Sequence, residues 1–253
     1  MAEPVADGIL NFINQNRIRN GALPARKILI FGAPKLGKTV LAARLGKHNW
    51  FVTDEDGYTS LENDSMRKLC GHWDGTLFEK WADVRIILQA AEAGQLICQC
   101  GEPVDNVILD TVSGMINHTV QQIIMSGTTP KTGKVSPEAA GLPDYLVSRE
   151  RLIPVMSQIA SMRNVSVTLT MHAREAGKVK TQVVPDAHNS AYEVINKYVS
   201  VQAHLTMNEE GERMLQVAPT GNGVVAGSRY DFPKTFVTDD EFVAHIENWK
   251  GVI

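Results

Sequence analysis

The residues best suited to chemistry stand together in the segment GAPKLGKT, residues 32–39. This segment follows an apolar run at residues 28–31 and precedes a helix-like stretch at residues 40–45. Its glycines allow the backbone to turn so that successive N–H groups point inward at phosphate oxygens. Lys38 can then reach the β- and γ-phosphates, and the Thr39 hydroxyl can ligate Mg²⁺. The pattern predicts a phosphate-binding P-loop for ATP and Mg²⁺, with nucleotide contacts from Gly32, Ala33, Pro34, Lys35, Leu36, Gly37, Lys38, Thr39 and Val40.

A second set of polar residues stands where predicted strands end. Asp110 follows the largely apolar residues 106–109, as a Walker B carboxylate does, and would hold Mg²⁺ together with Thr39. Many P-loop ATPases of the AAA+ type place their catalytic glutamate directly after this aspartate, but here the position is Thr111, which cannot act as a base. We therefore assign the orientation of the attacking water to Glu55, at the end of the neighbouring predicted strand.

The turn that carries Glu55 leaves alternatives open. Asp54 and Asp56 flank it and are rivals for the same role. A run of acids in a turn can also be no more than a solvated surface. The sequence alone does not separate these interpretations.

The elements that would position these residues alternate between strands and helices. Strands are predicted at residues 28–31, 50–53, 106–110 and 165–170, and apolar residues at helical spacing predict an amphipathic helix over residues 78–91. Such alternation implies an α/β fold, in which a mostly parallel sheet is flanked by helices on both faces. Ligands of such sheets bind at the carboxyl ends of the strands, where the polar residues above are expected.

The C-terminal part of the chain has a different pattern. Residues 199–207 and 213–217 are strand-like and are joined by residues 208–212, which predicts a β-hairpin extension. The residues Thr238 and Glu241 match a capping box that begins a terminal helix. We predict one domain over residues 1–253, with an N-terminal helical appendage (1–26), an ATPase core (27–233) and a C-terminal helix (234–253).

Composition limits the remaining function classes. The 253 residues carry a formal net charge of −3, which argues against a globally basic nucleic-acid binder, so any such contact must be local or assembled from several subunits. No segment has the length and apolar character of a membrane helix, and no secretory signal is evident, so we expect a cytoplasmic protein without membrane contact. Cys70 and His72, with Cys98 and Cys100, could form a zinc site, but their one-residue spacers are unlike the usual zinc knuckle.

Taken together, these motifs resemble a known family. Residues 32–39, the acidic turn at 53–57, the strand ending in Asp110 and the strand ending in His172 are similar to the RecA-like P-loop ATPases. More narrowly, they look like the small bacteriophage-encoded nucleotide-binding proteins linked to single-strand annealing and recombination. The resemblance covers roughly residues 27–233.

The resemblance implies further roles for matching residues. His172 takes the place of the γ-phosphate sensor that ends the fourth strand in this family. Arg229, in the segment AGSRYDFP at residues 226–233, lies where the family presents a basic residue to the nucleotide of a neighbouring subunit. A lysine commonly precedes that arginine, whereas this chain has Gly227 and Ser228. Arg229 would therefore act alone, or would only pair with a surface carboxylate.

DNA contact is implied for the loops after the third and fourth predicted strands. Residues 126–137 combine Gly, Pro, Ser and Thr with two lysines and no acid, and residues 174–180 follow His172 directly. The basic residues that the resemblance assigns to single-stranded DNA are Lys131, Lys134, Arg174, Lys178 and Lys180. Binding through such charges would be sequence-tolerant and strongly salt-dependent. A solvated surface loop is the plain alternative for each of them.

These features favour an ATP-hydrolysing, RecA-like ATPase that assembles into a ring or filament and acts on single-stranded DNA in recombination or annealing. A single-strand DNA-binding protein is a further candidate partner. Three alternatives stay open: a helicase-loader-type replication accessory ATPase, a P-loop kinase for a small acceptor, and a DNA-coating protein in which ATP only controls assembly. DNA-stimulated hydrolysis and oligomer formation would separate the first from the others.

Overall fold

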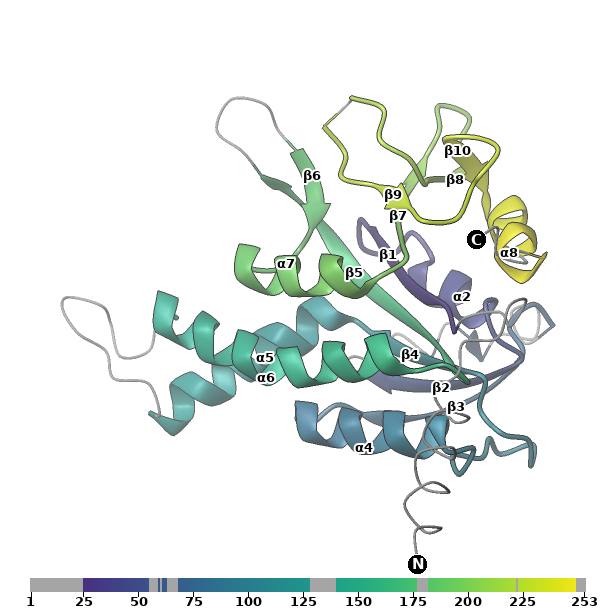
Figure 1. Ribbon diagram of the computed structural model, residues 1–253. Helices are drawn as coiled ribbons and strands as arrows, with labels where there is room; N and C mark the ends of the chain where they lie inside the picture. The colour runs from purple at the N-terminus through teal and green to yellow at the C-terminus, as the bar shows by residue number, and fades with distance from the viewer. Residues whose placement is uncertain are drawn as a thin grey trace, which may run out of the picture.

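The computed structural model describes residues 25–54, 59, 61–62, 68–127, 140–176, 182–221 and 223–248. Strands and helices alternate through most of this range (Figure 1). In chain order the elements are β1 (Lys27–Gly32), α2 (Lys38–Ala43), β2 (His48–Thr53), β3 (His72–Leu77), α4 (Trp81–Glu92), β4 (Asn106–Asp110), α5 (Val112–Ser126), α6 (Leu142–Ser161), β5 (Ser166–Ala176), β6 (Gln182–Pro185), α7 (Asn189–Tyr198), β7 (Val201–Met207), β8 (Arg213–Gln216), β9 (Gly227–Ser228), β10 (Phe236–Thr238) and α8 (Asp239–Asn248).

One sheet organises these elements. Its strand order is β10-β8-β7-β1-β5-β4-β2-β3, with β6 paired to β5 and β9 paired to β7. The six strands from β7 to β3 run parallel, while β8, β10, β6 and β9 pair in the antiparallel sense. The predicted fold class, a mostly parallel α/β sheet flanked by helices with a C-terminal hairpin, is confirmed. The central strand β1 leads into the P-loop and is buried along its whole length.

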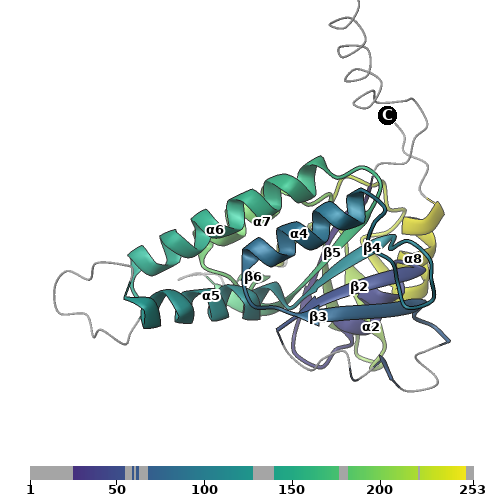
Figure 2. The same ribbon diagram turned by 90° about the horizontal axis from the view of Figure 1, so that it is seen from below.

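Two apolar cores lie on the two faces of the sheet. Side chains of α4, α5, α6 and α7 pack on one face with the buried residues Leu29, Val107 and Leu169. Side chains of α2 and α8 pack on the other face with Ile30 and Ile108. Figure 2 shows α4, α5 and α6 together on one side of the strands. Because both faces of the sheet are covered at its centre, β1 and β4 are buried along their whole length.

The C-terminal elements largely match their prediction. The strands β7 and β8 form the expected antiparallel hairpin, and β10 adds a third strand to it. The capping box is present, because the Thr238 backbone N–H donates to Glu241 Oε2 at 2.9 Å and the Glu241 N–H donates to Thr238 Oγ1 at 3.2 Å. The terminal helix begins at Asp239 and is described to Asn248, rather than beginning at residue 234.

Four of the described strands, β3, β6, β9 and β10, were not predicted, and α4, like α8, begins later than predicted. Strand β3 pairs in parallel with β2 at the edge of the sheet, and β6 folds back on an extended β5. The apolar pattern placed Phe78 in the first turn of a helix, but the helix begins at Trp81. The proposed N-terminal appendage falls mostly at residues 1–24, outside the described residues. Among the described helices, none is both long enough and apolar enough to cross a membrane.

Candidate nucleotide-binding site

The P-loop joins β1 to α2 through a tight turn whose two glycines are sterically required. A Cβ on Gly32 would lie 2.4 Å from the Leu205 carbonyl oxygen of β7, so the backbones of β1 and β7 approach too closely for any side chain. Gly37 is the N-cap of α2 and has φ 89°, in the left-handed region that favours glycine. No side chain caps α2, so its first backbone N–H groups are turned towards the loop without a competing acceptor from a cap.

Lys38 lies inside this turn. Its side chain is buried, and its Nζ donates to the Gly32 carbonyl at 3.2 Å and to the Ala33 carbonyl at 2.8 Å. The crest of the loop at residues 33–35 is exposed. The ammonium group is therefore held beneath an open crest, where phosphate oxygens can replace the loop carbonyls as its acceptors.

Asp110 ends β4 beside the P-loop, at the predicted position, while its role as a metal ligand stays a prediction. The Thr39 hydroxyl donates to its Oδ2 at 2.7 Å, and the Thr170 hydroxyl of β5 donates to its Oδ1. Asp110 is only 3% exposed, so its charge is stabilised by these two hydroxyl donors. A hydroxyl and a carboxylate at this distance are the oxygen ligands that Mg²⁺ prefers.

The acid that follows β2 in the chain is placed next to Asp110 by strand pairing. Thr53 is the register partner of Asp110, and the Asp54 N–H donates to the Asp110 carbonyl at 3.2 Å. The Asp54 carboxylate accepts the Thr111 N–H at 2.7 Å and lies so close to Gly114 that a Cβ there would approach it to 1.5 Å. Asp54 is therefore engaged at the start of α5, which makes it a poorer candidate for orienting the attacking water.

The residue assigned to the water, Glu55, lies outside the described residues, as does Asp56. The structure brings the chain to the predicted place, because Asp54 immediately precedes Glu55. The role of Glu55 itself stays a prediction.

His172 lies on β5 opposite the first residue of the P-loop turn. It is the register partner of Gly32, and its side chain projects to the same face as Thr170, two residues earlier. Its Nδ1 is buried and has no hydrogen-bond partner among the described residues. A buried ring nitrogen beside the loop that would hold the γ-phosphate is free to donate to a phosphate oxygen.

One cation at the loop was not found from the sequence. Arg213, the first residue of β8, lies so close to Gly37 that a Cβ there would be 2.2 Å from its Nη1. Its Nη2 pairs with Asp239 Oδ2 at 2.6 Å, and Arg44 pairs with Asp239 at 3.9 Å. Burial raises the pKa of the Asp239 carboxyl, while Arg213 and Arg44 counteract this. No motif predicts Arg213, because the hairpin fold alone brings it to the loop.

Arg229 lies at the amino end of β7, whereas the P-loop lies beside the carboxyl end of that strand. Its backbone N–H donates to the Ser200 carbonyl at 2.8 Å, just before the start of β7. The P-loop end of β1 pairs instead with Leu205, four residues further along β7. Four strand residues span about 13 Å. Arg229 is exposed and cannot belong to the nucleotide site of the same subunit.

The residues assigned to DNA are only partly described. Lys131, Lys134, Lys178 and Lys180 lie outside the described residues. Arg174 extends from β5 towards the start of α7, where its Nη2 donates to the Ala187 carbonyl at 2.9 Å and to Asn189 Oδ1 at 3.0 Å. Its Nε also lies 3.6 Å from Asp186 Oδ1. Arg174 is thus already engaged within the subunit, and its contact with DNA stays a prediction.

These residues fit a nucleoside triphosphate and a divalent cation. The loop supplies backbone N–H groups and the Lys38 ammonium for phosphate oxygens, and Thr39 with Asp110 supplies two oxygen ligands. The unpartnered Nδ1 of His172 supplies a further donor in the same place. The fold and the site therefore define a P-loop nucleotide-binding protein.

Comparison with known proteins identifies the family to which the chain belongs. The sequence profile of a family described as "AAA domain" matches residues 25–230. The chain belongs to this family and is a P-loop ATPase. No curated protein matches the sequence. Among solved structures, the chain is similar to the RadB recombinase at 15% identity and a TM-score of 0.42, over 76% of this chain and 80% of that chain.

Proposed function

We propose that this ATPase hydrolyses ATP with Mg²⁺, assembles into a RecA-like ring or filament, and acts on single-stranded DNA in recombination or annealing. The observation that carries the hydrolytic part is the hydrogen-bonded series Thr39–Asp110–Thr170 beside the P-loop. It brings the two proposed metal ligands, from α2 and β4, to one point, and a hydroxyl of β5 holds the carboxylate. Magnesium bound there would neutralise charge on the phosphate oxygens during transfer.

The protein residues divide the remaining tasks. Lys38 binds the β- and γ-phosphates, Glu55 orients the water, and His172 donates to the γ-phosphate. Arg213, beside Gly37, adds a positive charge from the same subunit. In this proposal Arg213 exchanges its ion pair with Asp239 for the phosphate when ATP binds.

A short network links the γ-phosphate sensor to the hairpin beyond it. The His172 N–H donates to Ser113 Oγ at 3.2 Å, and the Ser113 hydroxyl donates to the Asp186 carbonyl at 2.8 Å. The Asp186 N–H returns to the His172 carbonyl at 2.7 Å. These bonds tie the sensor, the start of α5 and the end of β6 together. A shift of His172 on hydrolysis would therefore move the β5–β6 hairpin, whose connecting residues carry Lys178 and Lys180.

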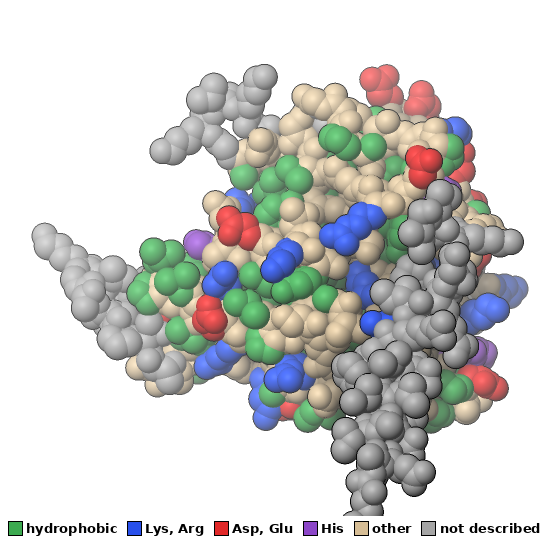
Figure 3. Space-filling model, viewed as in Figure 1, with side chains coloured by type: hydrophobic (Ala, Val, Ile, Leu, Met, Phe, Trp, Pro, Cys, Tyr) green, Lys and Arg blue, Asp and Glu red, His purple; other side chains and the backbone are tan. Residues whose placement is uncertain are grey.

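The proposed role of Arg229 requires assembly. Because this arginine lies far from its own P-loop, it could serve only the nucleotide of a neighbouring subunit. On the face seen in Figure 3, Lys and Arg side chains are dispersed among apolar and acidic ones and do not form one patch. Single-stranded DNA would then be held by a few charges from each subunit, multiplied along the oligomer.

ATP hydrolysis with and without single-stranded DNA tests the proposal. Stimulation by DNA, with rings or filaments in electron micrographs, supports it. Stimulation by a protein partner but not by DNA would indicate a loader-type ATPase, and phosphate transfer to a metabolite would indicate a kinase. Binding of ATP and DNA without turnover would indicate a coating protein.

Two substitutions test the assigned site. Lys38→Ala should abolish hydrolysis and weaken ATP binding. Glu55→Gln should keep ATP binding and lose turnover by roughly 10²-fold or more, because the water loses its base. Glu62→Gln, an exposed acid further along the same connection, is the matched control and should behave as wild type. Loss of ATP binding in Glu55→Gln would make this residue structural or a metal ligand.

Subunit mixing tests Arg229. Arg229→Ala and Lys38→Ala proteins should each be inactive alone if the arginine acts across an interface. Mixed together they should recover part of the activity, because an Arg229→Ala subunit with an intact P-loop receives the arginine of its Lys38→Ala neighbour. Full activity of Arg229→Ala alone, or no recovery on mixing, would refute the assignment.

A further inference from the structure

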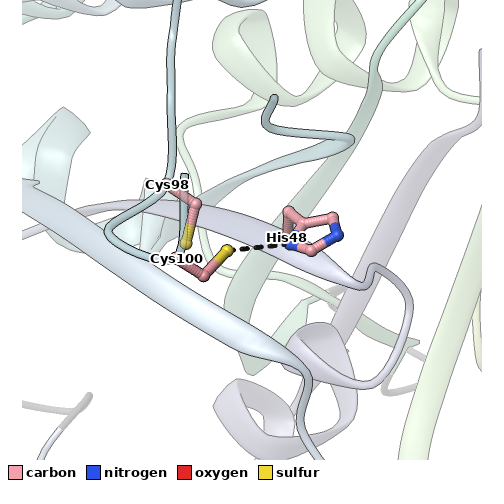
Figure 4. A group of neighbouring side chains, drawn as sticks. All are labelled: His48, Cys98 and Cys100. Carbon is pink, nitrogen blue, oxygen red and sulfur yellow. Dashed lines mark hydrogen bonds between the residues drawn. The ribbon is translucent and has the colours of Figure 1, made fainter. Parts of the chain in front are cut away.

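Two thiols and one imidazole meet near the amino ends of β2 and β4, away from the nucleotide site. They are His48, the first residue of β2, and Cys98 and Cys100, in the loop that precedes β4 (Figure 4). One ligand atom from each residue lies within 4.8 Å of the others. Cys98 is 2% exposed, His48 is half-buried and Cys100 is exposed, so the cluster is anchored in the core and open to solvent on one side.

The separation of the ligand atoms matches a small tetrahedral ion. The Cys100 Sγ lies 3.3 Å from His48 Nδ1. In a tetrahedral zinc site, Zn–S bonds of about 2.3 Å and Zn–N bonds of about 2.05 Å place sulfur and nitrogen about 3.6 Å apart, and two sulfurs about 3.8 Å apart. The Cys100–His48 pair is therefore within about 0.3 Å of the separation that the ion would require, and the other two pairs lie within 4.8 Å, so a small inward movement would complete the site.

The loop that carries the two thiols is shaped by its own hydrogen bonds. The Cys98 N–H donates to the Glu102 carbonyl at 2.9 Å, and the Gly101 N–H donates to the Cys98 carbonyl at 2.8 Å. Gly101 has φ 92°, a conformation that favours glycine. This turn brings Cys98 and Cys100 to one side despite their single-residue spacer. Strand β2 then supplies the third ligand from a distant part of the sequence.

The grouping differs from the one that the sequence suggested. Cys70 is fully buried in the apolar core on the other face of the sheet from Cys98, so it cannot join that thiol. His72 lies beside the cluster without belonging to it, because its ring stacks on that of His48 at a centroid distance of 5.8 Å. The four possible zinc ligands Cys70, His72, Cys98 and Cys100 are therefore not brought together. His48 lies beside Cys98 and Cys100 in place of Cys70 and His72.

We infer that His48, Cys98 and Cys100 bind one zinc ion, with water in the fourth position. Two thiolates and one imidazole form a donor set that suits zinc and not the magnesium of the nucleotide site. From His48 to Thr53, strand β2 extends about 17 Å, so the two metals would occupy opposite ends of one strand. The ion would tie the start of β2 to the loop before β4.

The test uses the full-length reduced protein and zinc itself. After removal of loosely bound metal, wild type should retain about one zinc per chain by elemental analysis, and Co²⁺ in its place should give a thiolate-to-metal charge-transfer band. Cys100→Ser, an exposed position whose substitution leaves the core intact, should lose affinity by at least about 100-fold, beyond the loss expected for a mere outer-shell contact. Cys70→Ser is the matched control and should retain the zinc.

A second measurement does not depend on how tightly zinc survives purification. Added zinc should raise the unfolding temperature of wild type and Cys70→Ser, but not of Cys100→Ser, because only a folded site binds the ion. ATP hydrolysis by Cys100→Ser should be unchanged, which separates this inference from the proposed function. Less than stoichiometric zinc in wild type, or equal zinc affinity in Cys100→Ser, would overturn it.

Discussion

Substituting Gly37 with alanine would test the contact between Arg213 and the P-loop. Gly37 has φ 89°, and an L-residue held there costs about 1–2 kcal/mol. The new Cβ would also meet Arg213 Nη1 at 2.2 Å, which forces the end of this flexible side chain to move. Its ion pair with Asp239 joins side chains that are 37% and 10% exposed, so losing it costs at most about 1 kcal/mol. The expected destabilisation is about 1–3 kcal/mol.

A double-mutant cycle separates the two contributions. Urea unfolding is measured for wild type, Gly37→Ala, Arg213→Ala and the double variant, with the denaturant slope checked for constancy. In the Arg213→Ala background, Gly37→Ala should cost only the backbone part, so the two substitutions should be coupled by up to about 1 kcal/mol. Lys234→Ala removes an exposed ion pair with Glu241 and should show no coupling to Gly37.

The same four proteins report on nucleotide binding. Gly37→Ala should bind ATP more weakly than its loss of stability explains, because the turn that points the N–H groups inward is itself changed. Additive unfolding free energies at Gly37 and Arg213 would refute the packing of this arginine on the loop. Such a result would also remove Arg213 from the proposed site, without affecting Lys38.

Two further predictions concern buried polar groups in the same region. Thr170→Val removes a hydroxyl donor to the buried Asp110 carboxylate, and should lower the free energy of unfolding by about 1.5–3 kcal/mol in urea. It should also weaken Mg²⁺-dependent ATP binding. The matched control Thr168→Val should leave the Mg²⁺ dependence unchanged, and equal effects of the two substitutions would contradict the metal role. Burial lowers the pKa of His204, whose ring lies 4.9 Å from that of Phe31. As pH falls below about 6.5, this histidine therefore binds a proton more readily in the unfolded chain than in the native state, which lowers the free energy of unfolding. Wild type should lose stability between pH 7.5 and 5.5 more steeply than His204→Phe in urea unfolding, and parallel pH profiles would disprove this.

Short-range patterns were sufficient for the part of the site that is local in sequence. The apolar run, the two glycines and Lys38-Thr39 lie within one strand–turn–helix unit, and the structure reproduces it. The position of Asp110 could be predicted equally well, because a carboxylate that ends an apolar strand lies at the carboxyl ends of the parallel strands, where ligands bind.

Features that depend on pairing between distant segments were missed. Strand β3 has the sequence HWDGTL and is mostly exposed, so it lacks an apolar run and exists because β2 offers it an edge. Arg213 reaches Gly37 only because β8 folds back beside β7. His48 likewise joins Cys98 and Cys100 through the sheet. Hydrophobic periodicity predicts on which face of a strand or helix a residue lies, but not which residue from a distant part of the sequence it contacts.

The register of β2 connects these observations. A slip of one residue would send every β2 side chain to the opposite face, and would move the chain that leaves the strand away from Asp110. The register is held at the amino end, where the Asn106 side chain donates to Asn49 Oδ1 at 2.9 Å and the Asp105 carboxylate accepts the His48 N–H at 3.1 Å. It is held at the carboxyl end by the Asp54 N–H on the Asp110 carbonyl.

A zinc ion on His48 would add a third restraint at the amino end, where β2 is tied to the same loop that leads into β4. It would stabilise the edge of the sheet without contacting the nucleotide. Strand pairing, and not the conformation of the acidic turn, thus sets the point at which the chain leaves β2. This point lies one residue before Asp54 and two before Glu55. The sheet register therefore fixes where the chain leaves β2 beside Asp110, and the proposed role of Glu55 depends on that point.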